Sequence, residues 1–236
     1  TAMLVDVETL VFLDAKSYEL RTFIDAYLPL LDLIHYVLCA LAVREDFGWR
    51  WNTDNPVISW FFTVTRSLAG VILSNVLLGV PPLISGLMDA TKLTKITVIW
   101  LVIFYSPRDF CYSSLEPRSK TRHVFLLLKE VQRAHKVYIG WIEAPTSDSF
   151  TKFISAAKGA GNGLIRNIQQ IAVGTGTFRT TNEFFNPSPP AKIAILSALA
   201  FTFLDVNRNL TYLVVVHAAI ALKAAAIAGK PIFGLN

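Results

Sequence analysis

The sequence predicts an all-α polytopic membrane protein with seven transmembrane helices, built as two inverted three-helix repeats plus a seventh helix. Composition is the first reason: of 236 residues, 53% are hydrophobic and 17% are charged, and the mean hydropathy is +0.47. Soluble domains usually carry about 25% charged residues. The second reason is that several apolar stretches approach the roughly 20 residues that a helix needs to span a bilayer.

Seven spans are predicted, each bounded by Pro, Gly or clusters of charge. They cover residues 27–43, 57–79, 93–112, 120–140, 147–173, 190–204 and 211–228. An odd number of spans places the two termini on opposite sides. Eight Lys and Arg residues fall in the loops of one side and four in the loops of the other, so the positive-inside rule predicts a cytosolic C-terminus and an N-terminus on the lumenal side.

The chain divides into four predicted regions. Residues 1–26 form an amphipathic segment, residues 27–112 the first three-helix repeat, residues 113–204 the second and inverted repeat, and residues 205–236 the seventh helix with the C-terminus. The repeat rests on two similar segments that are rich in small residues, SLAGVILSN (67–75) and KGAGNGLIRN (158–167), each central in a group of three spans. Such paired segments point to a permeation or substrate site, although small residues also mark ordinary helix packing.

The fourth span carries Lys129, Arg133 and Lys136 at positions i, i+4 and i+7, so the three cations lie on one helix face. Each charge costs roughly 2.5–3.5 kcal/mol at a bilayer centre. A lipid phosphate could compensate them. The alternatives are pairing within the protein, with Glu130 on Arg133 and a snorkelling Lys136, or a site for a substrate anion.

The second and fifth spans supply the candidate pore-lining or hinge residues. In the fifth span, Lys158 stands beside Gly159, Gly161 and Gly163, and glycines at this spacing favour a helix that kinks or opens in a cavity. In the second span, Ser67, Gly70 and Ser74 form one stripe that faces either a pore or a neighbouring helix. Asp32 is an acid deep in the first span, and we expect it to pair with Lys158 or Arg66.

Enzyme chemistry is not predicted. The four histidines lack metal-ligand spacing, and the chain has neither a Gly-rich phosphate loop nor a nucleophile elbow. We expect no metal cofactor and, because the basic residues form no soluble face, no nucleic-acid partner.

The segment KEVQRAHKV (129–137) resembles the Lys-Glu-Val-x-Arg-x-x-Lys-[Ile/Val] signature of the trimeric intracellular cation (TRIC) channels, and the chain is similar to their type B members. Supporting similarity lies in LPLLDLIHYV (28–37), PVISW (56–60), LLGVP (77–81) and WIEAPTSDSFTKFISAAKGAGN (141–162).

This resemblance implies a homotrimer with one potassium-permeable pore in each protomer, in the endoplasmic or sarcoplasmic reticulum membrane. It also implies phosphatidylinositol 4,5-bisphosphate as a regulatory lipid held by the cations of the signature, Lys129 and Arg133. The competing interpretation is a seven-helix small-solute transporter of the sugar type, which gives no reason for a cationic fourth helix.

Overall fold

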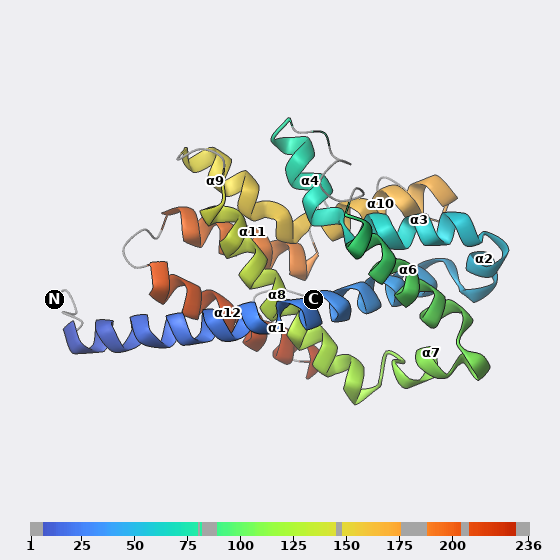
Figure 1. Cartoon of the computed structure of the whole chain (residues 1–236), viewed down its shortest axis with the longest axis horizontal. Helices are drawn as coiled ribbons and strands as arrows, with labels where there is room; N and C mark the ends of the chain where they lie inside the picture. The colour runs from blue at the N-terminus through green and yellow to red at the C-terminus, as the bar shows by residue number, and fades with distance from the viewer. Residues whose placement is uncertain are drawn as a thin grey trace.

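The computed structural model describes residues 7–79, 81, 89–144, 148–175, 188–203 and 208–229. Every regular element in this part of the chain is a helix, and the helices pack into one elongated bundle (Figure 1). The prediction of an all-α fold is therefore confirmed.

The first helix is longer than its predicted span. Helix α1 (Val7–Phe47) has 41 residues and continues without interruption past residue 26, so the predicted amphipathic segment and the first span share one helix. Pro29 lies inside it. The helix ends at Gly48, whose φ of 80° lets the chain turn into α2 (Trp49–Asp54) at no steric cost.

The second predicted span is bent instead of straight. It consists of α3 (Pro56–Ser67) and α4 (Ala69–Leu77), which meet at an angle of 64°. Pro56 opens α3, as proline often does at a helix start. The third span is α6 (Ala90–Tyr105), followed by the short helices η1 (Pro107–Asp109) and α7 (Phe110–Ser114).

The remaining predicted spans also coincide with helices. They are α8 (Lys120–Ile142); the broken unit α9 (Ser149–Ala156), η2 (Ala157–Ala160) and α10 (Gly161–Val173); α11 (Pro189–Phe203); and α12 (Arg208–Ile227). The glycine-bearing fifth span is thus interrupted, as the sequence predicts.

Two described helices are long and apolar enough to cross a membrane by themselves, α1 over Val11–Phe47 and α12 over Asn209–Ile227. The bent pair α3 and α4 becomes a third candidate when it is counted as one span. Helix α11, with 15 residues, is apolar but shorter than the roughly 20 residues that span a bilayer core.

The two broken helices cross at their breaks, where backbone meets backbone. A methyl group on Gly70 would overlap the carbonyl oxygen of Lys158, and a methyl group on Gly161 would lie 2.5 Å from the carbonyl oxygen of Ala69. The contact is reciprocal, because each helix supplies one glycine and one carbonyl. Helices in membranes approach this closely only where side chains are absent.

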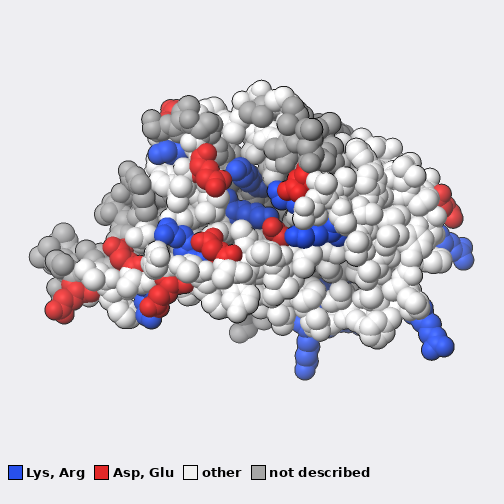
Figure 2. Space-filling model, viewed as in Figure 1, with Lys and Arg blue, Asp and Glu red and all other residues white. Residues whose placement is uncertain are grey.

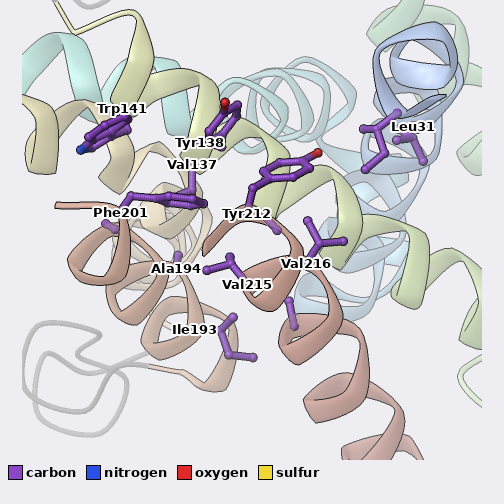
Figure 3. Packing of buried hydrophobic residues seen from close by; sticks show 14 residues of the cluster. Leu31, Val137, Tyr138, Trp141, Ile193, Ala194, Phe201, Tyr212, Val215 and Val216 are labelled. Atoms are coloured by element: carbon purple, nitrogen blue, oxygen red, sulfur yellow. The ribbon is translucent and has the colours of Figure 1, made fainter. Parts of the chain in front are cut away.

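The largest buried apolar cluster lies between α8, α11 and α12, with Ile24 and Leu31 of α1 against it. Figure 3 shows its aromatic centre, where the Tyr138 ring lies 4.7 Å from the Tyr212 ring and 5.4 Å from the Phe201 ring, measured between centroids. This cluster fixes α8, and therefore the cations on its other face, against the rest of the second half.

Candidate functional site

A cavity of about 280 Å³ lies where the broken helices cross, between them and helices α1 and α8, with Lys92 of α6 also in its lining. Seven of the predicted site residues line it: Lys129, Arg133, Lys136, Ser67, Gly70, Lys158 and Gly159. The lining does not include Ser74, Gly161 or Gly163. Two groups of residues that the sequence treats separately, the cationic stripe and the small-residue segments, therefore form one site.

The three cations of α8 differ in their partners. Arg133 forms an ion pair with Glu130, which is 2% exposed, and Lys136 Nζ lies 2.7 Å from Asp32 Oδ1. Among the described residues no carboxylate lies within ion-pair distance of Lys129. One cation of the stripe is thus available to a ligand without breaking an existing pair.

The predicted ion-pair partner of Asp32, Lys158 or Arg66, was wrong. Asp32 pairs with Lys136 and accepts a hydrogen bond from Gln132, instead of pairing with Lys158 or Arg66. The reason is packing, because α1 and α8 are direct neighbours. Gln132 and Lys136 lie one turn apart on the same face of α8, and both contact Asp32. The acid therefore belongs to the stripe on α8.

Arg66 is buried at the cavity wall and makes a network of its own. Its Nε donates to Gln169 Oε1 (2.6 Å), and its Nη1 lies 2.6 Å from Asp46 Oδ2. Gln169 in turn donates to the carbonyl oxygen of Phe62 (3.0 Å) and to Thr65 Oγ1 (2.9 Å). The network connects α1, α3 and α10 just beyond the crossing.

The break in the first unit leaves a carbonyl that another helix satisfies. His35 of α1 donates from Nε2 to the carbonyl oxygen of Ser67 (3.1 Å), at the last residue of α3. Ser74 is buried and is not among the lining residues, and its hydroxyl donates to the carbonyl oxygen of Val71 (3.1 Å). Ser67 and Ser74 therefore do not act as one stripe.

The lining is strongly basic. Its described residues include one carboxylate, Asp32, against six basic side chains, which are Arg66, Lys92, Lys129, Arg133, Lys136 and Lys158. Figure 2 shows Lys and Arg side chains in a band across the middle of one face, next to acidic side chains. Such a cavity attracts a multivalent anion, and without one it repels cations.

Sequence reasoning missed several lining or supporting residues. His35 shares one face of α1 with Asp32 and Cys39, at spacings of three and four residues. This helical spacing could have identified His35 as a neighbour of Asp32. Asp46 carries a weaker signal, a charged residue in the run Arg44-Glu45-Asp46 at the end of an apolar helix. No local pattern identifies Gln169, because its partners lie more than 100 residues away.

Comparisons with known proteins agree with this architecture. The family model described as TRIC channel matches residues 48–229. The trimeric intracellular cation channel type 1B.2 of Caenorhabditis elegans is 32% identical, over 94% of this chain and 73% of that protein. The type B channel of Danio rerio is 34% identical, over 74% of this chain and 61% of that protein.

A solved structure shows the same fold. The structure of a trimeric intracellular cation channel from C. elegans in the absence of Ca²⁺ superposes with a TM-score of 0.79 at 28% identity. The superposition covers 91% of this chain and 97% of that one.

Proposed function

Because the chain belongs to the TRIC channel family, we propose that it conducts potassium across an intracellular membrane, through the cavity at the crossing of its two broken helices. Members of the family are channels and not enzymes. The observation that carries the proposal is the cavity itself, which lies at the crossing where both interrupted helices contribute backbone and side chains. Interrupted helices at corresponding places in two halves of a chain typically form transport sites.

A cation pathway with six basic lining residues needs a source of negative charge. Phosphatidylinositol 4,5-bisphosphate supplies it, because its phosphates carry more negative charge than Lys129 and Arg133 carry positive charge. Lys129 has no carboxylate partner among the described residues, and Arg133 faces the same cavity. The lipid headgroup occupies this basic end and makes the potential there favourable for potassium.

Each protomer of a homotrimer contains its own pathway. Support comes from the origin of the cavity walls, since α1, both broken helices, α6 and α8 of a single chain form them. The protein resides in the endoplasmic or sarcoplasmic reticulum, a location that its similarity to intracellular cation channels supports. The distribution of Lys and Arg favours an N-terminus in the lumen and a C-terminus in the cytosol.

Bilayer recording of the purified protein in a potassium chloride gradient tests the activity. The expected reversal potential lies close to the potassium equilibrium potential. A reversal potential near that of chloride, or no current from protein whose insertion has been verified, contradicts the proposal.

The lipid is tested separately, by native mass spectrometry of Lys129→Ala, Arg133→Ala and Lys136→Ala with the bisphosphate lipid. Retention should fall most for Lys129, which is unpaired among the described residues, less for Arg133, and least for Lys136, which Asp32 already neutralises. Lys129→Ala should fold, since removing an unpaired intramembrane charge lowers the cost of insertion. Arg133→Ala and Lys136→Ala leave Glu130 and Asp32 without their ion-pair partners, so the insertion of these two variants is verified before lipid retention is compared. Unchanged retention in both of the first two variants shows that the stripe serves internal pairing.

Mixed trimers distinguish separate pores from a shared one. When active and pore-blocked protomers are combined, separate pores lose current in proportion to the blocked share. Complete loss from one blocked protomer indicates a single common pathway.

A further inference from the structure

Asp46 lies near the end of α1, outside the cavity, and contacts an arginine of each broken unit. Its Oδ2 lies 2.6 Å from Arg66 Nη1 and accepts from Arg166 Nε (2.9 Å), while its Oδ1 accepts from Arg166 Nη2 (2.5 Å). The Asp46 side chain is 8% exposed and that of Arg66 is fully buried. The carboxylate is therefore shared between two guanidinium groups from opposite halves of the chain.

The two arginines differ in what they can do without Asp46. Arg166 is 51% exposed and can turn its charge toward solvent. Arg66 is held in place, because its side chain is fully buried and Gln169 accepts from its Nε. Loss of the Asp46 charge thus leaves a full positive charge fixed at the cavity wall.

We propose that Asp46 is a specificity-determining residue of the ion pathway, which acts by cancelling the charge of Arg66. This inference rests on the proposed potassium conduction through the cavity. The Asp46 carboxylate does not line the cavity and touches no ion, so it is a positioning and compensating residue. The lipid neutralises the α8 end of the cavity, and Asp46 neutralises the opposite end at α3.

The neighbouring residue offers a matched control. Glu45 also makes an ion pair, with Arg122 at the start of α8, and neither residue lines the cavity. Glu45→Gln removes the same charge as Asp46→Asn, one residue away and at the same end of α1. An effect of Asp46→Asn that Glu45→Gln lacks therefore reports on Arg66 and not on the general charge of this surface.

The experiment measures the potassium-to-chloride permeability ratio of the full chain in bilayers that contain the bisphosphate lipid. A unit charge about 5 Å from an ion in water changes the local cation concentration roughly fourfold, so Asp46→Asn should lower the ratio at least about fourfold. Glu45→Gln and Asp46→Glu should keep the wild-type ratio. Adding Arg66→Gln to Asp46→Asn should restore the ratio, a rescue that a purely structural role of Asp46 does not produce.

A second variant keeps the test decisive if Asp46→Asn fails to fold. Arg66→Gln alone leaves the Asp46 charge in place, so the permeability ratio should rise above that of the wild type. A wild type without cation current refutes the proposed conduction. A conducting wild type with equal ratios in Asp46→Asn and Glu45→Gln, or a ratio that Arg66→Gln does not raise, overturns the role of Asp46 alone.

Discussion

The two broken helices cross at one point but are held there by different forces. The first unit breaks at a single residue, Leu68, and a buried polar network of Arg66, Gln169 and Asp46 holds it on one side of the break. The second unit breaks over the four residues of η2, and packing holds it: a methyl group on Gly159 would meet Ala194, Val137 and Arg133 at 3.0–3.1 Å. Ion pairs and hydrogen bonds therefore hold the first break, and close packing holds the second.

This difference indicates how a cavity can tolerate charge in an apolar medium. The polar network binds the arginine that faces the cavity, so its charge is compensated before any ion arrives. The packed break leaves Lys158 unpaired among the described residues, with its backbone against Gly70. We expect the effect of a substitution to decrease from the crossing itself to the polar network, the packed break and the start of α6.

Gly70→Ala should have the largest effect, because the added methyl overlaps a backbone carbonyl that no rotamer change can move. Overpacking of this kind destabilises by about 1–3 kcal/mol, and the rigid neighbour places Gly70→Ala at the upper end. Thermal unfolding in detergent measures the loss. Gly161→Ala should match it, since its methyl meets the backbone of Ala69 in the same way; a large loss in one variant only would show that the crossing is not reciprocal.

Gln169→Leu should follow, because it removes the acceptor of a buried guanidinium N–H while keeping the side-chain volume similar. A buried donor without its partner costs about 1–3 kcal/mol. The unfolding temperature should fall, and the Arg66→Met variant combined with Gln169→Leu should recover part of it. No recovery in the double variant would mean that Gln169 acts through Phe62 and Thr65 alone.

Gly159→Ala should have a smaller effect than Gly70→Ala, although both add one methyl at a break. Two of the atoms that it meets belong to the Val137 and Arg133 side chains, which can move by a few tenths of an ångström, whereas Ala194 Cβ moves only with its helix. Overpacking and the helix preference of alanine then nearly cancel, within about 1 kcal/mol. The same unfolding measurement checks this, and a loss as large as that of Gly70→Ala would show that the second break is as rigid as the crossing.

Asp89→Ala, at the start of α6, should have the smallest effect. Asp89 caps α6 by accepting a hydrogen bond from the backbone N–H of Lys92 (3.1 Å). This hydrogen bond and the ion pair with the Lys92 ammonium together hold the pKa of Asp89 below its usual value of 3.8. A lowered pKa means that the stabilisation is present above pH 3.8 and is lost as the pH falls through the lower value in the folded protein. The difference between wild type and variant, followed by thermal unfolding against pH, should therefore vanish in acid. A difference that persists there would assign it to packing.

The positions of most helices were predicted from the sequence, because hydropathy and the Pro, Gly and charged residues that bound a span are local properties. The break at η2 followed from Gly159 and Gly161. In the second span the sequence marked Ser67, Gly70 and Ser74 as pore-lining or hinge residues, but it did not place the break at Leu68, where neither Gly nor Pro stands. In the site, the cations of α8 were found from their spacing. The partner of Asp32 was not, since it depends on which helices are neighbours.

The reciprocal contact of Gly70 and Gly161 also determines which part of the pathway can change its width. Side chains adjust by rotating, but at the crossing the opposing atoms are backbone carbonyls and α-carbons, which have no rotamers. The distance between the two helix backbones at the crossing is consequently constant on the timescale of side-chain motion. Any widening of the pathway must come from rigid-body rotation of α4 or α10 about this contact. Such collective helix motion belongs to the microsecond-to-millisecond range.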